Sequence, residues 1–129
     1  MSPTQPRPKP PQPAPQAGVV TRAVVRAAER LDLSNRVLSG VLGLSEATVS
    51  RMGTAAYQLD PHGKPFELAV LFLRLYRSLD ALVDGDMSVA RAWLRNANTA
   101  LGAAPIDQMA SVAGLVTVVA YLDARRALV

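Results

Sequence analysis

The side chains that perform covalent or metal chemistry are scarce in this chain of 129 residues. It contains no cysteine, which excludes disulfides, thiolate metal sites and cysteine nucleophiles. Its single histidine, His62, lies in a stretch rich in proline and glycine (60–65) that we expect to be an exposed loop. Asp84 and Asp86 flank Gly85, a place where carboxylates commonly cap a turn. We therefore expect no enzymatic activity, no metal site and no cofactor.

The basic side chains could bind an anionic partner, and their excess is confined to one part of the chain. The formal net charge is +4, and residues 65–129 contribute nothing to it because their basic and acidic side chains are equal in number. Arg7 and Lys9 supply half of the excess, and residues 18–64 supply the rest. An anionic partner such as DNA should therefore meet the N-terminal half.

Residues 35–54 have the pattern of a helix-turn-helix, the motif that presents a helix to the major groove of DNA. Gly43 is placed to make the turn and Ser45 to cap the second helix. The candidate DNA-binding residues are Arg36, Ser45, Glu46, Ala47, Ser50, Arg51 and Thr54. Only Arg51 could make a bidentate contact with guanine, and Glu46 repels phosphate. A motif kept only for packing is therefore the alternative.

The elements that must position these residues are all predicted to be helices. Alanine and leucine are abundant, and apolar residues recur at three-to-four spacing. The helices are expected at 19–31, 35–42, 45–54, 66–83, 87–101 and 111–128, with a short helical turn at 106–110. Residues 1–17 hold seven of the ten prolines and should form a disordered arm. We expect an all-α protein with a helix-turn-helix domain at 18–64 and a second helical domain at 65–129.

The segment 66–83 is apolar around most of its circumference, unlike an ordinary surface helix with one apolar stripe. Such a helix must be central to the core or shared with another chain. We expect it to mediate homodimerisation, which also suits DNA recognition by a two-fold pair of helix-turn-helix units. The candidate dimerisation residues are Phe66, Val70, Leu73 and Arg77.

From Ala92 the chain reads Ala-Trp-Leu-Arg-Asn-Ala-Asn-Thr-Ala-Leu-Gly-Ala-Ala-Pro, followed by Gly114 and the series Val118, Tyr121, Leu122. This order, after the helix-turn-helix and the apolar helix, resembles the Xre/MbcA/ParS antitoxin family over about residues 20–129. The resemblance implies a bacterial toxin–antitoxin module whose partner is a RES-domain toxin, an enzyme that consumes NAD or ADP-ribosylates a host protein. It also implies inhibition by C-terminal residues placed in or over the toxin active site, with operator DNA as a second partner.

The toxin-binding residues expected from this resemblance and from the C-terminal sequence are Trp93, Asn96, Asn98, Pro105, Gly114, Tyr121, Arg125, Arg126, Leu128 and Val129. Asp123, Arg125 and Arg126 are expected near a free helix tip, where the guanidinium groups could pair with acidic residues of the toxin pocket. Arginines that merely complement the helix dipole are the alternative. No segment is long and apolar enough for a membrane span, so we expect a cytoplasmic protein. The competing functional hypothesis is a stand-alone dimeric transcriptional regulator.

Overall fold

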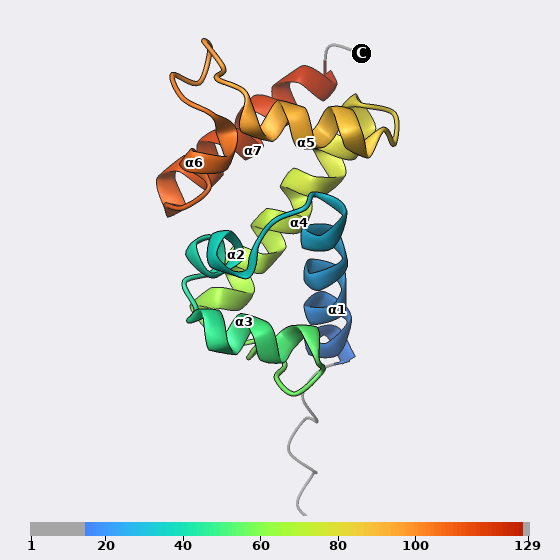
Figure 1. Cartoon of the computed structure of the whole chain (residues 1–129), viewed down its shortest axis with the longest axis vertical. Helices are drawn as coiled ribbons and strands as arrows, with labels where there is room; N and C mark the ends of the chain where they lie inside the picture. The colour runs from blue at the N-terminus through green and yellow to red at the C-terminus, as the bar shows by residue number, and fades with distance from the viewer. Residues whose placement is uncertain (1–14, 128–129) are drawn as a thin grey trace, which may run out of the picture.

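The computed structural model describes residues 15–127, which fold into helices connected by short loops (Figure 1). The helices are α1 (Pro15–Arg30), α2 (Asn35–Leu42), α3 (Glu46–Gly53), α4 (Lys64–Leu82), α5 (Met87–Arg95), α6 (Pro105–Gln108) and α7 (Val112–Ala127). The part of the chain that the structure describes contains no β-strand, only an isolated bridge between Asn98 and Ala103. Across the same residues, none of the helices has the length and apolar character needed to cross a membrane. The predicted all-α fold, with an N-terminal helix-turn-helix, is confirmed.

Helix α1 begins four residues earlier than predicted, within the stretch assigned to the arm. Proline is tolerated in the first turn of a helix, so Pro15 does not prevent the start. Ala17 is 1% exposed. Its carbonyl oxygen accepts a hydrogen bond from the hydroxyl of the buried Thr21 at 2.6 Å. The Thr21 hydroxyl also accepts a hydrogen bond from the backbone N–H of Leu59 at 3.0 Å. Burial against the loop after α3 therefore extends the helix, whereas the rest of the predicted arm, 1–14, lies outside the described residues.

Helix α5 ends at Arg95, not at residue 101 as predicted. The Asn98 side chain accepts hydrogen bonds from the backbone N–H groups of Ala100 and Leu101, at 3.0 and 3.2 Å. Gly102 then adopts a φ of 81°, a left-handed conformation that suits glycine. The asparagine thus offers the backbone a turn in place of a helical continuation. The result is a largely exposed loop after Arg95 where the sequence predicted that the helix would continue to residue 101.

The helix-turn-helix has the turn glycine and the Ser45 cap that the sequence predicted, and a second serine cap at Ser34. The Ser34 hydroxyl accepts a hydrogen bond from the Val37 N–H at the start of α2, and the Ser45 hydroxyl accepts one from the Thr48 N–H at the start of α3, both at 3.1 Å. Gly43 ends α2 with a φ of 68°. The tight turn between the two helices therefore depends on Gly43 and on the Ser45 hydroxyl cap, while Ser34 caps the other end of α2.

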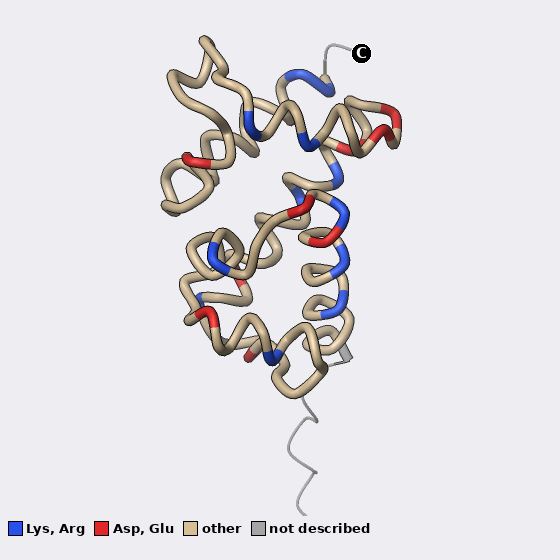
Figure 2. Tube along the Cα trace, in the orientation of Figure 1, with Lys and Arg blue, Asp and Glu red and all other residues tan. Residues whose placement is uncertain are grey.

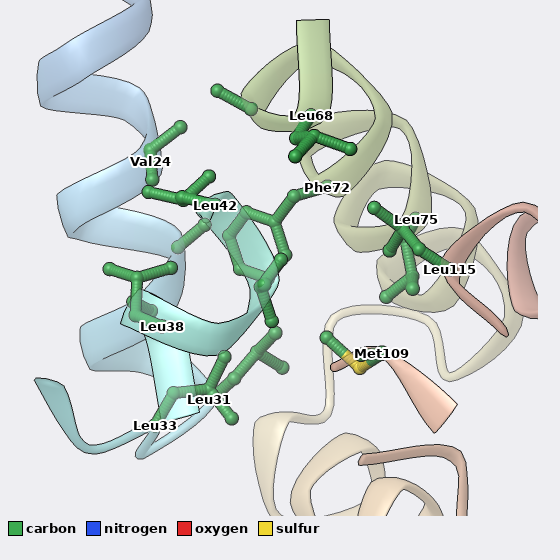
Figure 3. Close-up of a cluster of buried hydrophobic side chains, with 14 of the residues drawn as sticks. Val24, Leu31, Leu33, Leu38, Leu42, Leu68, Phe72, Leu75, Met109 and Leu115 are labelled. Carbon is green, nitrogen blue, oxygen red and sulfur yellow. The ribbon is translucent and has the colours of Figure 1, made fainter. Parts of the chain in front are cut away.

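Helix α4 runs between the lower group α1–α3 and the upper group α5–α7 (Figure 1) and packs against α1, α2 and α7. Its Phe72 is fully buried, next to Leu42 of α2, and Leu75 continues the cluster toward Leu115 of α7 and Met109 (Figure 3). The buried apolar residues of both groups form one cluster. Most of the apolar circumference of α4 is thus used inside the fold, and Val70 is its most exposed large apolar side chain, at 47%.

Candidate functional site

Three side chains from two helices form a stack on the surface of the C-terminal group. Trp93 of α5 and Tyr121 of α7 lie with ring centroids 6.2 Å apart and ring planes 20° from parallel. The guanidinium carbon of Arg125 lies 5.3 Å from the centroid of the Tyr121 ring, within range of a cation–π interaction. Both rings are half-buried and Arg125 is exposed. The stack therefore presents aromatic surface and one positive charge together.

A hollow of about 550 Å³ lies beside this stack. It is lined by Trp93, Tyr121 and Arg125 and by the residues from Asn96 to Ala100. Five of the ten predicted toxin-binding residues therefore meet at one place: Trp93, Asn96, Asn98, Tyr121 and Arg125. Tryptophan, tyrosine and arginine are the residue types most often found to dominate the energy of protein interfaces. The described lining combines aromatic rings, amide groups and a guanidinium group, a composition that suits recognition of another protein surface.

The loop and helix that hold Trp93 are fixed at both ends by side-chain caps. At the start of α5, the Asp86 carboxylate accepts hydrogen bonds from the Ser88 hydroxyl at 2.8 Å and from the Ser88 and Val89 N–H groups at 3.1 and 3.3 Å. The Ser88 hydroxyl bond, followed by the Val89 N–H bond, holds the pKa of Asp86 below its usual value. At the other end, the Asn98 turn closes the loop. The position of Trp93 is therefore set by local hydrogen bonds as well as by packing.

Arg126 and Asp123 do not lie at a free tip, in contrast to the sequence-based expectation. Asp123 forms a salt bridge with Arg74 of α4 and accepts a hydrogen bond from the Ser78 hydroxyl at 3.0 Å. Arg126 donates to the same hydroxyl at 3.2 Å, and Ser78 itself is fully buried. These contacts attach the end of α7 to α4. Of the two arginines, Arg125 is the one that lines the hollow.

Of the remaining predicted toxin-binding residues that the structure describes, none lines the hollow. Pro105 is buried as the first residue of α6. Gly114 lies in the first turn of α7, where an added Cβ would be 1.9 Å from the carbonyl oxygen of Gln108, so packing alone requires glycine. Leu128 and Val129 lie outside the described residues.

The candidate DNA-binding residues lie on the exposed side of α2 and α3. Glu46, Ala47, Ser50, Arg51 and Thr54 are all exposed, while Val49 and Met52 of the same helix are buried. Arg36 is exposed at the start of α2, and Ser45 caps α3. The arrangement is that of a helix-turn-helix with a free second helix. Its charge is mixed, because Glu46 accompanies Arg51.

The four candidate dimerisation residues share α4 but differ in surroundings. Phe66 and Leu73 are half-buried, and Val70 and Arg77 are exposed. Leu73 and Arg77 also line a groove that α4 shares with α1.

Two arginines that sequence reasoning passed over join the N-terminal and C-terminal groups. Arg91 Nε donates to the carbonyl oxygen of Arg30 at 2.7 Å, and Arg95 Nη2 donates to those of Leu31 and Asp32 at 3.1 and 2.7 Å. Figure 2 shows the basic positions of α5 close to this end of α1. Carbonyl groups at a helix C-terminus lack partners within the helix and favour positive charge. In sequence, two arginines four residues apart look like an ordinary solvent-exposed helix face, so no signal could have identified this role.

Comparison with protein families gives two matches, which together span nearly the whole chain. Residues 16–74 match the antitoxin Xre-like helix-turn-helix domain, and residues 78–127 match the antitoxin Xre/MbcA/ParS C-terminal toxin-binding domain. A search of curated protein sequences gives no match. The hollow beside Trp93 lies within the second matched region, and the exposed face of α3 lies within the first.

Proposed function

The chain belongs to the Xre/MbcA/ParS antitoxin family, with a helix-turn-helix domain and a toxin-binding domain, and we propose that it neutralises a RES-domain toxin by covering the toxin active site. The surface that makes the contact is the hollow lined by Trp93, Asn96, Tyr121 and Arg125. The protein acts in this account as a binding partner and not as an enzyme.

The observation that carries the proposal is the stack of Trp93, Tyr121 and Arg125 within the region that matches the toxin-binding domain. The aromatic rings offer apolar contact area at low cost in side-chain entropy, and they hold the guanidinium group beside the hollow. A toxin pocket that binds a pyrophosphate-bearing cofactor needs polar and charged side chains of its own, to which an arginine and asparagine amides can hydrogen bond. We therefore assign the inhibitory role to Arg125, whereas the sequence-based hypothesis assigned it to Arg125 and Arg126 together.

Co-purification with a co-expressed RES-domain toxin tests the proposal, with Arg125→Ala and Arg126→Ala as a matched pair. Arg125→Ala should weaken binding about tenfold or more, as expected for an arginine at the centre of an interface. Arg126→Ala should chiefly lower the melting temperature, because Arg126 is bonded to Ser78. Truncation from residue 123 is a poorer test, because it also removes the contacts of Asp123 with α4. Unchanged co-purification of both the Arg125→Ala and the Trp93→Ala proteins would contradict the proposed surface.

We further propose that the helix-turn-helix binds the operator of its own operon as a homodimer. The exposed face of α3 supports the first part, and Phe66 with the exposed Val70 supports a two-fold contact through α4. Phosphate contacts make such binding weaken steeply with added salt. A gel-shift titration on the promoter at two salt concentrations tests the first part, and light scattering tests the second.

A further inference from the structure

A row of arginines follows the exposed side of α1, away from the hollow beside Trp93 and from the exposed face of α3. Arg22, Arg26 and Arg30 recur every four residues, which places them on one face of the helix at intervals of about 6 Å. All three are exposed, and Figure 2 shows the basic positions repeating along α1. This row is a denser positive surface than α3, where Arg51 is accompanied by Glu46.

Helix α4 completes a groove with this row. The groove has a volume of about 360 Å³ and is lined from α4 by Leu73, Tyr76 and Arg77. The Tyr76 hydroxyl accepts a hydrogen bond from Arg30 Nη1 at 3.2 Å, which fixes one end of the row. The apolar part of the lining includes Val19, which is 55% exposed, and Ala23. We call this surface the arginine groove.

The charges on the arginine groove have one sign. Four arginines line it, and no acidic side chain is among its described lining residues. The nearest acidic groups are on the same helices: Glu29 is exposed on α1, and Asp80 on α4 acts electrostatically on Arg30. The groove therefore combines a net positive charge with exposed apolar side chains.

Positive charge combined with exposed apolar side chains favours some binding partners of the groove over others. Phosphates of duplex DNA would pair with the arginine row but would leave Val19 and Leu73 without apolar contact, and a groove of this volume accepts side chains and not a duplex. A second copy placed on it by a two-fold axis would bring arginines against arginines. Carboxylates, by contrast, form bidentate hydrogen bonds with guanidinium groups, and an apolar side chain between them would fill the space over Leu73 and Ala23.

We propose that the arginine groove docks an acidic segment of a partner protein, with carboxylates paired to Arg22, Arg26 and Arg77 and an apolar anchor over Leu73. This surface goes beyond toxin neutralisation as proposed above, because none of its residues lines the hollow beside Trp93. It gives the antitoxin a second docking site that remains open when the C-terminal surface is occupied.

Fluorescence anisotropy with the full chain tests this inference. The probe is a short fluorescein-labelled peptide in which glutamates flank a Leu-Phe pair. One control peptide has glutamine in place of glutamate, and a second has alanine in place of the Leu-Phe pair. The double variant Arg26→Gln/Arg77→Gln should weaken binding of the probe about tenfold or more, because two charge-assisted contacts are lost. Lys64→Gln removes a positive charge from the exposed start of α4, outside the groove, and should leave binding unchanged.

Both control peptides should bind more weakly than the probe, because the groove needs both the charge and the anchor. Equal binding of the glutamine peptide, or equal binding by the double variant with its melting temperature retained, would overturn the proposal. If random-sequence duplex DNA displaces the probe and the Leu-Phe pair has no effect, the groove is a nucleic-acid surface. If binding of the probe falls as the protein self-associates, a second copy covers the groove, and the proposal is again overturned.

Discussion

Gly114 shows how a residue can match a functional motif and still be required by packing. The Cβ of an alanine at this position would lie 1.9 Å from the carbonyl oxygen of Gln108 and 2.8 Å from its carbonyl carbon. Both atoms belong to the backbone of Gln108, the last residue of α6, whose carbonyl oxygen also accepts a hydrogen bond from the Ser111 N–H just before α7. A glycine is therefore needed here whether or not a toxin touches it.

We predict that Gly114→Ala lowers the free energy of unfolding by roughly 3 kcal/mol, because the backbone must shift to admit one methyl group. Gly40→Ala is the matched control: Gly40 also lies in a helix, and its added Cβ would meet only the Ala110 Cβ at an ordinary 3.9 Å. That substitution should be neutral or stabilise the fold by roughly 0.5–1 kcal/mol. Chemical denaturation of the two proteins measures both values. Equal stabilities would show that the turn before α7 is more adaptable than its geometry indicates.

Helix α5 connects the helix-turn-helix domain to the toxin-binding domain. Its arginines supply hydrogen bonds to three carbonyl groups at the end of α1, while its Trp93 faces the hollow of the toxin-binding domain. We predict that Arg91→Gln/Arg95→Gln lowers the free energy of unfolding by about 1–2 kcal/mol, since exposed carbonyl groups can recover part of the loss by binding water. Arg51→Gln, which removes an exposed guanidinium from α3, should change stability little. Thermal melts compare the double variant with Arg51→Gln. Equal melting temperatures would exclude a stabilising role for the hydrogen bonds of Arg91 and Arg95 to the end of α1.

The sequence predicted the type of every element because the apolar spacing and the serine caps act locally. The bounds of α1 and α5 were wrong because one depends on tertiary contacts and the other on a side-chain turn, and apolar spacing reveals neither. Burial of Ala17 and the Thr21 hydrogen bond to Leu59 extend α1, and the Asn98 turn ends α5. The meeting of Trp93, Tyr121 and Arg125 depends on how α5 and α7 pack, so only the motif, and not its geometry, could be predicted. The pairing of Arg126 with Ser78 of α4 gave no sequence signal at all.

One apolar cluster continues from the helix-turn-helix into the toxin-binding domain through α4 (Figure 3). Most of the apolar residues of α4, from which we predicted contact with a second chain, are therefore buried between the two domains of the same chain. Val70 of α4 is among the large apolar side chains that stay exposed. Three further surfaces present polar or charged groups: the face of α3, the hollow beside Trp93 and the arginine groove. Because these surfaces share none of the residues that define them, each can be altered without changing the other two.

The proposed antitoxin function is tested by measuring whether this protein inhibits a purified RES-domain toxin, followed as consumption of NAD. We predict that the intact chain stops the reaction at equimolar concentration, and that the Trp93→Ala and Arg125→Ala proteins each need about tenfold higher concentration for the same inhibition. A toxin that stays fully active in excess antitoxin, or that is inhibited equally by the intact chain and both variants, would contradict it.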